Sequence, residues 1–548
     1  MPSISAPEML AGFTSDGRNV SLPGILTGAE ALVLVDRMPR HTALFVIEEH
    51  PWQVKLALRL RDYSHLLASG RLVFIVGSDL EERMREFFGA HPGYEPPTRM
   101  LSPPQRSPAQ IAELQRRLEN TGEEALRVSR GFAEACAARI ASRTAGAPGT
   151  APRVAILSFD VQPGSIQQCA RVRRALEKLQ LAHEVCIPDT PRNSHVAAHL
   201  NAIDRLPADL VLMINSPYQG IARFLPPHLP VVCWYLPGTS SQPPPPQESS
   251  SCTLLFTSCD PHGEMPRHGG AQACSIRYIE PGADNQAYYP THGTPGGAGR
   301  PAIDVVILMD VPDDRAEACD TTLSSHLILW RAIRQLLGEA VDTWTADQAA
   351  ELVDRAQRAS GVTLADPAIR EHFAGLARAR IAPACRARAV VAVVSASTRR
   401  FATWGLNWHL ACDHSGVWRG AGPFADQLND LFNSTRIVVL PDYSPTALQH
   451  ALDALAAGAR VVCHAPDQPF ERAHPTLITL QPYLHLFRTR RELRDTLKSL
   501  LSQSTGGDDD DTTAARAIVL EKHCVSDRLQ VILNERARLS AAFPNQER

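Results

Sequence analysis

The amino-acid sequence predicts an α/β protein with two doubly wound parallel sheets, preceded by a smaller α/β segment. From residue 153 onwards, short apolar runs of strand length alternate with helical patterns, which is typical of parallel sheets covered by helices. The same alternation occurs on both sides of a turn-rich segment at residues 291–302. The 548 residues are 44% hydrophobic and 21% charged, an ordinary globular composition and enough chain for three domains.

The first segment, residues 1–145, is predicted to be an α/β accessory domain. Apolar runs at 43–47 and 72–77 indicate two strands, and the pattern between them, at 52–60, indicates a helix. Residues 107–142 have helical apolar spacing and many Glu and Arg, so we expect one long helix or a helix pair. A stretch rich in Ala, Gly and Pro at 145–152 predicts a linker.

The second segment, residues 153–290, is predicted to be the first Rossmann-like domain. A helix is expected at 166–179, and the strands are expected at 154–159, 183–187, 208–214, 230–235 and 253–257. Four consecutive prolines in the insert 240–251 indicate an exposed loop. The turn-rich segment 291–302 is interpreted as a hinge.

The third segment, residues 300–502, repeats the strand and helix alternation. Helices are expected at 324–337, 424–433 and 446–457, and strands at 304–309, 389–394, 437–440 and 460–463. An acidic run within 502–513 predicts a solvated linker. The last region, 514–548, is expected to be a single terminal helix, extending to about residue 542.

Composition and charge exclude several classes of partner. Lys plus Arg is 55 and Asp plus Glu is 58, so the net charge of -3 provides no field for a phosphate polymer, and we expect no nucleic acid partner. No apolar run approaches the length that crosses a bilayer, and the N-terminus has no signal-peptide pattern, so a cytoplasmic protein is expected. The 12 cysteines have no C-x-x-C spacing and are expected to be reduced, and no histidine spacing suits a metal.

Several segments resemble one family of enzymes in the same order along the chain. Residues 424–440, 441–446 and 451–462 resemble the donor half of GT-B glycosyltransferases, closest to the spore-maturation CgeB-like group. Residues 229–237, 278–290 and 404–408 are similar to further motifs of that group, and together the matches cover about 153 to 500. The resemblance implies two Rossmann-like domains that face a cleft, with the acceptor bound by 153–290 and a nucleotide-sugar donor by 300–502. It implies no bound cofactor.

The resemblance also implies a role for the loop and helix after the strand 437–440. GT-B enzymes hold the donor diphosphate with backbone N–H groups at a helix start, here the loop with Tyr443 and Ser444 and the helix from Thr446. The alternative interpretation of these residues is an ordinary capped helix without a ligand. Asp453 stands where the family's helix carries a Glu that binds the nucleotide ribose, although an Asp there is as often a solvated or capping residue. Pro445 occupies a position at which many related enzymes carry another acid.

Other donor-side candidates are cationic or aromatic. Arg315 follows the strand 304–309 and Arg399 follows the expected strand 389–394, so both could face the diphosphate, although surface arginines are common in this chain. Trp404 could stack on the nucleotide base. A buried pair with Trp408 is the alternative.

On the acceptor side, the loop after the strand 154–159 contains Asp160, Gly164 and Ser165. Asp160 could act as a base toward an acceptor hydroxyl, or it could simply form the turn. Pro237 stands where the CgeB-like pattern usually has an Asp, and with Asp453 in place of Glu this leaves a degenerate copy open.

The functional prediction is therefore a metal-independent glycosyltransferase acting on a nucleotide-sugar and a glycan, protein or small-molecule acceptor. No isolated D-x-D motif occurs outside the acidic run, which argues against the metal-dependent GT-A class. The alternative is a catalytically inactive GT-B-like protein that binds a nucleotide or glycan or acts as a scaffold. A third possibility keeps the fold and changes the reaction to nucleotide-sugar epimerisation.

Overall fold

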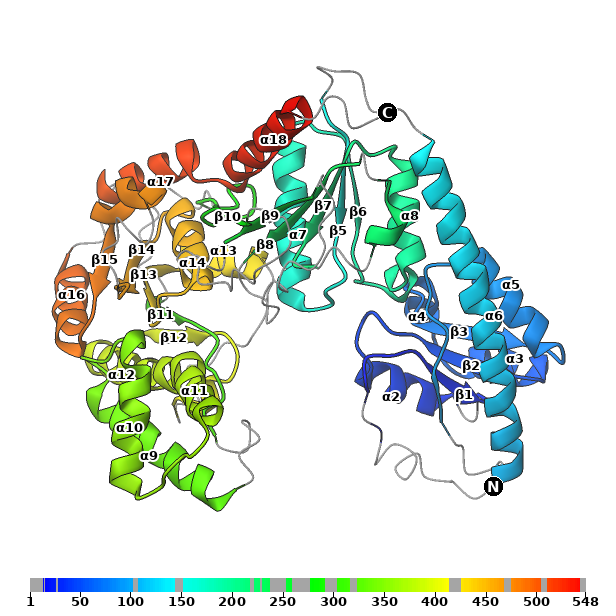
Figure 1. Ribbon diagram of the computed structural model, residues 1–548, viewed down its shortest axis with the longest axis horizontal. Coiled ribbons are helices and arrows are strands. Elements are labelled where there is room, and N and C mark those ends of the chain that lie inside the picture. The colour runs from blue at the N-terminus through cyan, green and yellow to red at the C-terminus, as the bar shows by residue number, and fades with distance from the viewer. Residues whose placement is uncertain are drawn as a thin grey trace. The chain divides into compact units, whose positions relative to one another are not determined.

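The computed structural model describes most of the chain, and Figure 1 shows it as a ribbon. The described residues are 13, 15–25, 28–101, 107–142, 151–216, 221–226, 229–236, 253–258, 276–290, 303–315, 323–412, 425–467, 475–503 and 510–542. The proline-rich insert 240–251, the hinge 291–302 and Pro237 lie outside them.

The chain divides into two compact units. One unit contains Met1–Thr257, Pro266–Arg277 and Ile532–Arg548, and the other contains Ser258–Met265 and Tyr278–Val531. Apart from Ser258–Met265, the chain therefore stays in the first unit up to Arg277, lies in the second unit from Tyr278 to Val531, and returns to the first at Ile532. Within the described residues, the strands form three sheets, two in the first unit and one in the second.

The N-terminal sheet has the strand order β3-β2-β1-β4, and all its pairings are parallel. Its strands are β1 (Val20–Pro23), β2 (Leu44–Glu48), β3 (Leu72–Val76) and β4 (Arg99–Met100). Its helices are α2 (Ala29–Arg37), α3 (Pro51–Leu60), α4 (Ser64–Ala68), α5 (Leu80–Ala90) and α6 (Pro108–Ala141). The predicted strands at 43–47 and 72–77 are confirmed, and the long helical pattern forms the single helix α6.

Helix α6 joins the cores of the two sheets in the first unit. Leu114 and Leu118 pack with the core of the N-terminal sheet, while Cys136 and Ile140, farther along the helix, pack with the core of the second sheet. Its start is fixed by a capping box, in which Ser107 and Gln110 bond each other's backbone N–H groups. Figure 1 shows the helix running past α5 and α8 (Val196–Arg205).

The second sheet of the first unit is doubly wound, with the order β10-β9-β8-β7-β5-β6. Its strands are β5 (Val154–Leu157), β6 (His183–Cys186), β7 (Leu210–Ile214), β8 (Val231–Tyr235), β9 (Thr253–Thr257) and β10 (Ile276–Tyr278). The pairings from β6 through β9 are parallel, and α7 (Pro163–Lys178) follows β5. All five strands predicted for this region are confirmed.

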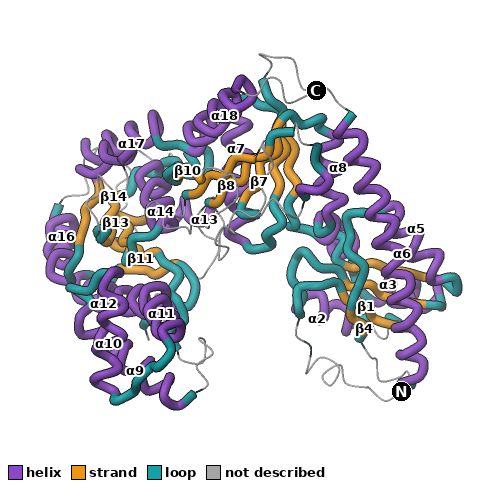
Figure 2. The backbone as a smooth tube through the Cα atoms, viewed as in Figure 1, coloured by secondary structure: helices purple, strands orange, loops and turns teal. Residues whose placement is uncertain are grey.

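The sheet of the second unit repeats this arrangement, with the order β12-β11-β13-β14-β15 and parallel pairing throughout. Its strands are β11 (Ile303–Leu308), β12 (Phe401–Trp404), β13 (Thr435–Leu440), β14 (Arg460–His464) and β15 (Leu484–Phe487). Helices α13 (Ala425–Asn433) and α14 (Pro445–Ala456) precede and follow β13. Figure 2 shows helices flanking the strands, so the predicted fold class, α/β with doubly wound parallel sheets, is confirmed.

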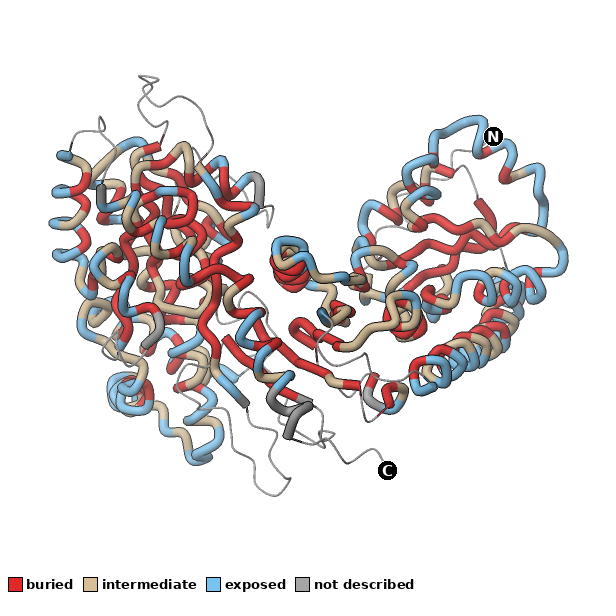
Figure 3. Tube along the Cα trace, turned by 90° about the horizontal axis from the view of Figure 1, so that it is seen from above, coloured by how far each residue is buried: buried red, intermediate tan, exposed pale blue. Residues whose placement is uncertain are grey.

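A helical insert separates β11 from β12. It contains α9 (Ser324–Ala340), α10 (Ala349–Ser360), α11 (Pro367–Leu376), a π-helical turn (Ala377–Ile381) and α12 (Ala382–Ser397). The prediction of a strand at 389–394 is wrong, because these residues lie in α12. Their valines read as a strand because α12 is buried on several sides, and an apolar run without helical periodicity does not distinguish a buried strand from a buried helix. Figure 3 colours the buried residues red along the Cα trace.

The C-terminal region contains α16 (Arg490–Ser502), α17 (Asp510–Lys522) and α18 (Val525–Ala542). The expected single helix from residue 514 is wrong, because the chain breaks at His523 and Cys524, and Asp510 to Thr513 belong to α17 rather than to a linker. At the break, the N–H of Ala283 donates to the carbonyl of His523 at 2.7 Å. No helix among the described residues is long and apolar enough to span a membrane.

Candidate functional site

The strand order places a switch point in each of the two larger sheets. β5 lies between β6 and β7, and β11 lies between β12 and β13, so the connections from each central strand run in opposite directions. In open α/β sheets, ligands bind at such points, outside the carboxyl ends of the strands. The loops after β11 and β13, and those after β5 and β7, are therefore the places where site residues are expected.

The loop after β13 leads into the start of α14 at the carboxyl edge of the second unit's sheet. The Ser444 hydroxyl accepts a hydrogen bond from the N–H of Ala447 at 3.2 Å, and Pro445 occupies the first helical position. Ser444 and Thr446 are half-buried, so the helix start is not covered completely. The predicted capped helix at this position is confirmed, and its N-terminal end carries the partial positive charge of a helix dipole.

A largely buried arginine stands beside this loop. Arg386, on α12, donates from Nη1 to Oδ1 of Asp442 at 2.8 Å, and its guanidinium lies 6.0 Å from the ring centroid of Trp344. Only 17% of the Arg386 side chain and 22% of the Asp442 side chain is exposed. Because one carboxylate neutralises a guanidinium that has five N–H donors, Arg386 keeps donors for a second acceptor.

His464, the last residue of β14, belongs to the same edge. Burial, together with the charges of Arg386 and Arg488, lowers its pKa to about 3. Its imidazole is therefore neutral near pH 7, and it packs edge-on against Phe487 with the ring centroids 5.5 Å apart. The buried Nδ1 makes no hydrogen bond of normal geometry with any described residue. The edge thus combines a helix start, a guanidinium and a neutral imidazole.

Two predicted aromatic residues border this edge. Tyr443 and Trp404 are half-buried and pack against the hydrophobic core, and burial raises the pKa of Tyr443, so its phenol stays protonated. Trp408 is fully buried and donates from its indole N–H to the carbonyl of Trp404 at 3.0 Å. The buried-tryptophan alternative therefore describes Trp408. Trp404, at the carboxyl end of β12, is only partly buried.

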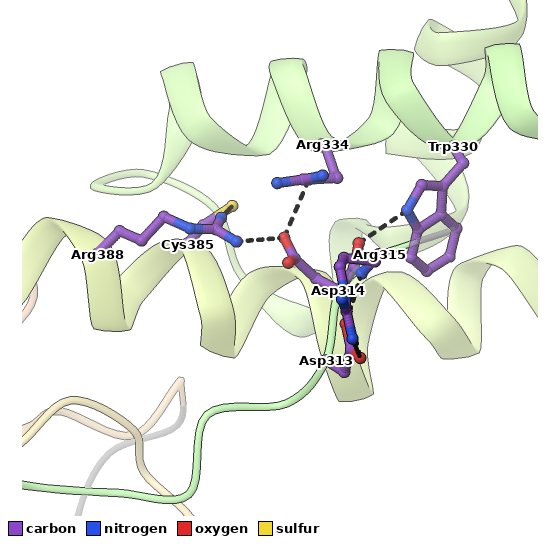
Figure 4. Close-up of polar contacts among 7 residues, drawn as sticks. All are labelled: Asp313, Asp314, Arg315, Trp330, Arg334, Cys385 and Arg388. Atoms are coloured by element: carbon purple, nitrogen blue, oxygen red, sulfur yellow. Dashed lines mark hydrogen bonds and ion pairs between the residues drawn. The ribbon is translucent and has the colours of Figure 1, made fainter. Parts of the chain in front are cut away.

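The loop after β11 is held in place by a charged cluster (Figure 4). Asp314 is buried, and its Oδ2 lies 2.6 Å from Nη2 of Arg388 on α12 and 3.0 Å from Nε of Arg334 on α9. Its carbonyl accepts a hydrogen bond from the indole of Trp330 at 3.0 Å. The cluster fastens the loop to the helical insert.

The predicted donor residue Arg315 follows this cluster in an exposed position. Its guanidinium pairs with Asp313 at 2.6 Å and, through those hydrogen bonds, lowers the pKa of Asp313 to about 2. Residues 316–322 are outside the described part, and α9 begins only at Ser324. Arg315 is therefore at the carboxyl side of β11, as predicted, and the carboxylate of Asp313 partly neutralises its charge.

Arg399 lies elsewhere. Because residues 389–394 are helical, Arg399 follows α12 and precedes β12, which places it at the amino ends of the strands. Its neighbour Arg400 pairs with Asp304 near the start of β11, at the same amino edge. The prediction that these arginines follow a strand is wrong, and the structure does not bring Arg399 to the edge that holds Ser444 and Arg386.

Asp453 is fully buried inside α14. Its Oδ1 accepts a hydrogen bond from the N–H of Asp284 at 3.2 Å and lies 3.5 Å from the side-chain nitrogen of Gln449. The segment that contains Asp284 is the one by which the chain enters the second unit. The carboxylate therefore ties α14 to this entering segment. Because it is fully buried and bonded to another segment, Asp453 is neither a solvated nor a capping residue, the two alternatives that the sequence left open.

The predicted acceptor residues lie together at the switch point of the first unit. Oδ2 of Asp160 accepts from the Ser165 hydroxyl at 2.6 Å, and Oδ1 accepts from the N–H of Gln162 at 2.9 Å. Gly164 lies beside Ser165 in the first turn of α7. Asp160 thus forms the turn into α7, as the bland alternative proposed.

Sequence reasoning missed the residues that extend this network to the next strands. The Asn215 amide donates to the Ser165 hydroxyl at 3.1 Å, and its oxygen accepts from the N–H of Leu236 at 2.7 Å. Ser216 accepts a hydrogen bond from the N–H of Phe159 at 2.7 Å. In the second unit, Arg386 and His464 were missed as well. The only sequence signal for Asn215, Ser216 and His464 is a polar residue directly after or at the end of an apolar strand, and nothing marks Arg386 within an alanine-rich helix.

Among the described residues, no three His, Cys, Asp or Glu side chains are grouped so that they could hold a metal ion.

Comparisons with known proteins return solved structures only. No protein-family model matches the chain, and no curated protein matches it. Sucrose-phosphate synthase from Thermosynechococcus elongatus is 13% identical with a TM-score of 0.37, over 71% of this chain and 100% of that one. Spinosyn rhamnosyltransferase SpnG complexed with thymidine diphosphate is 12% identical with a TM-score of 0.30, over 70% and 100%. Spinosyn forosaminyltransferase SpnP is 11% identical with a TM-score of 0.33, over 71% and 100%. At these values the matches assign no activity to this chain, and the resemblance to the CgeB-like group stays a prediction.

Proposed function

We propose that the chain is a glycosyltransferase that takes a sugar from a nucleotide-sugar donor by a metal-independent mechanism. The second unit binds the donor, and the first contributes the acceptor site for a glycan, protein or small molecule. A cytoplasmic location is part of the same proposal. One observation carries it: the start of α14, Arg386 and His464 stand at the same carboxyl edge of the second unit's sheet.

This edge has the groups that a diphosphate requires. The N–H groups in the first turn of a helix lack intrahelical partners, and here the Ser444 hydroxyl and carbonyl take up those of Ala447 and Leu448. Among the described residues, no group accepts a hydrogen bond from the N–H of Thr446, which can therefore donate to a phosphate oxygen. Arg386 supplies a fixed positive charge beside that donor.

These groups also suit the chemical step. As the glycosidic bond to the diphosphate breaks, negative charge develops on the leaving oxygen. Preorganised N–H donors and a guanidinium stabilise this charge more in the transition state than in the bound donor. The neutral imidazole of His464 can donate one further hydrogen bond without adding charge.

Asp160 is proposed as the base toward the acceptor hydroxyl. Its carboxylate already accepts hydrogen bonds from Ser165 and Gln162. A carboxylate has about four lone-pair positions, so it can accept one more hydrogen bond from a substrate hydroxyl. Its two existing bonds would hold it in one orientation.

The test is calorimetry of the full chain with UDP, GDP, ADP and TDP and their sugar conjugates. We expect at least one nucleotide diphosphate to bind, and Arg386→Met to weaken that binding by about tenfold or more, since a charge-assisted hydrogen bond is lost. The matched control is Arg378→Met, because Arg378 lies in the π-helical turn before α12 and pairs with exposed Glu371. If no diphosphate binds, or if both variants bind as the wild type does, the donor site is elsewhere or absent.

The second candidate is a binding module without catalysis. It is favoured by the carboxylates of Asp453 and Asp160, which are both engaged in holding the fold. A donor hydrolysis and transfer assay separates the two candidates. Nucleotide binding that depends on Arg386, with no release of sugar or diphosphate over many hours, would favour the module.

A further inference from the structure

Helix α3, on the N-terminal sheet, has a strongly apolar exposed face. Trp52, Leu56 and Leu60 are 62%, 50% and 67% exposed, and their spacing of four residues places them along one side of the helix. Leu58, farther round the helix, is 44% exposed. Large apolar side chains that are scattered singly on a surface need no explanation, but Trp52, Leu56 and Leu60 form one continuous stripe along this helix.

The charges on this helix all have one sign. Lys55 and Arg59 are exposed on the arc that separates Leu58 from Trp52, and Arg61 follows the helix directly. Residues 50–61 contain no Asp or Glu. In the part of the chain that the structure describes, no ion pair involves Lys55, Arg59 or Arg61. We call Trp52, Lys55, Leu56, Leu58, Arg59 and Leu60 the α3 face.

The exposed sides of the helices α5 and α6 carry charged residues that pair within the same helix. On α6, Arg116 pairs with Glu113 at 2.8 Å and Arg127 pairs with Glu124 at 2.6 Å. On α5, Arg83 pairs with Glu86 at 3.3 Å. These surfaces are charged and neutralised within the same helix, as expected for a face in contact with water. The α3 face combines large apolar side chains with two cations, and no carboxylate of the helix neutralises them.

The α3 face is also firmly held. Val54 and Ala57 are buried on the opposite side of the helix, and Ala57 packs in the core of the N-terminal sheet. The buried side of the helix therefore holds the face on a fixed support. Exposed apolar side chains on such a support can enter a deformable layer.

We propose that the α3 face docks on an anionic lipid surface. Trp52, Leu56 and Leu60 would enter the boundary between headgroups and acyl chains, where aromatic and aliphatic side chains of interfacial helices lie. Lys55 and Arg59 would extend to the lipid phosphates and carboxylates, with their aliphatic stems along the apolar side chains.

A second copy of the chain is a poorer occupant. A two-fold contact through the α3 face would bring the helix against its own symmetry mate, and Lys55 and Arg59 would then face the same cations with no carboxylate on the helix to offset them. An acidic protein partner would satisfy the charges, and the test treats it as an outcome. This proposal does not depend on the proposed transferase activity.

The test is cosedimentation of the full chain with vesicles of phosphatidylcholine, with and without about 30 mol% phosphatidylserine. We expect binding to the anionic vesicles, a weaker association at high salt, and a loss of about tenfold or more in Trp52→Ser/Leu60→Ser. Lys55→Glu/Arg59→Glu should remove the preference for phosphatidylserine. Circular dichroism and thermal unfolding would check that these exposed substitutions leave the fold unchanged.

Two matched controls lie on α6. Leu126→Ser removes an apolar side chain that is 45% exposed, and Arg116→Glu/Arg127→Glu reverses the same number of charges on a paired surface. Both should bind anionic vesicles as the wild type does. Controls that lose binding equally would show a non-specific effect of charge and overturn the assignment to α3.

Three other results would overturn the proposal. The first is no sedimentation with anionic vesicles. The second is a dimer in sedimentation velocity that Trp52→Ser abolishes, which would give the face to a second copy. The third is a protein that does not bind vesicles but binds a synthetic Glu- and Leu-rich helical peptide, with an affinity that depends on Trp52. That result would indicate an acidic protein as the partner of the α3 face.

Discussion

At the switch point of the first unit, Asp160, Ser165 and Asn215 bond one another in a row, whereas the edge of the second unit has the guanidinium of Arg386 beside the start of α14. Ser165 and Asn215 are buried and satisfied by neighbours on the same sheet edge. Arg386 and the start of α14 have donors to spare. Two sheets with the same central strand order thus differ in what they can bind, because topology fixes where a site lies and side chains fix its chemistry.

The largest expected effect concerns the charged cluster under the second edge. Arg334→Met/Arg388→Met should destabilise the fold by about 3 kcal/mol or more, because the buried carboxylate of Asp314 is left without a cation. Asp314→Asn should cost only about 1–2 kcal/mol, because both arginines are partly exposed and can be rehydrated. Urea unfolding of the three proteins measures this order. An Asp314→Asn variant that is the less stable of the two would contradict it.

The next effect concerns the neutral hydrogen bonds that Asn215 makes at the first edge. Asn215→Ala removes hydrogen bonds to Ser165 and to the N–H of Leu236, and Asn215 has a φ of 50°, which a short amide side chain tolerates better than alanine. We expect a loss of about 2 kcal/mol that does not change with salt. Unfolding in low and high salt checks this, and a strong salt dependence would show that charge matters at this edge too.

Acid should distinguish the second edge through His464. Its folded pKa, about 3, lies below its unfolded value, so the unfolded chain takes up the proton first as the pH falls. The contribution of the neutral His464 to the free energy of unfolding is fully present above the unfolded pKa and is lost as the pH falls toward the folded pKa. Between about pH 7.5 and about pH 5, His464 should cost about 2 kcal/mol of unfolding free energy.

His464→Asn should remove that part of the slope. His523, with a folded pKa lowered to about 4 mainly by burial, contributes a slope of the same sign and remains in the variant as an internal reference. Urea midpoints at a series of pH values give the comparison. Identical slopes in wild type and variant would mean that His464 is already hydrated in the fold.

The smallest effects concern the caps of the two helices that follow the switch-point strands. Ser444 caps α14, whereas Gln162, at the same position of α7, makes no side-chain cap. Ser444→Ala should cost about 1 kcal/mol, and Gln162→Ser should gain about half of that. Thermal unfolding measures both. Asp160 already accepts a hydrogen bond from the N–H of Gln162. If the Asp160 side chain must move to make room for the new serine hydroxyl, Gln162→Ser will not raise the melting temperature.

The sequence predicted most helices and strands correctly, but it rarely predicted which distant residues surround a given side chain. The strands that later form the centres of the sheets were recognised because buried parallel strands are short continuous apolar runs. The same criterion failed at residues 389–394, where α12 is equally apolar because the insert and the sheet cover it on different sides. The edge strand β12 was not predicted, because its residues FATW form no continuous apolar run.

The candidate site was predicted in part for a comparable reason. Ser444 and Thr446 were found because a cap and a helix start are local features of a few consecutive residues. Asp453 was placed on the correct helix, but whether it faces a ligand or another segment depends on residues 169 positions away. Arg386 reaches Asp442 across 56 positions, and no local pattern announces such a contact.

By itself, the sequence determined the α/β class, the alternation of elements and the start of α14, because hydrophobic periodicity and capping act between near neighbours in the chain. The tertiary structure alone decided which polar groups share an edge, why Asp453 is buried and bonded inside the fold, and why no described segment covers the apolar α3 face. These outcomes depend on strand order and on contacts between distant segments, and burial, pKa and hydrogen-bond partners are properties of that arrangement rather than of any residue on its own.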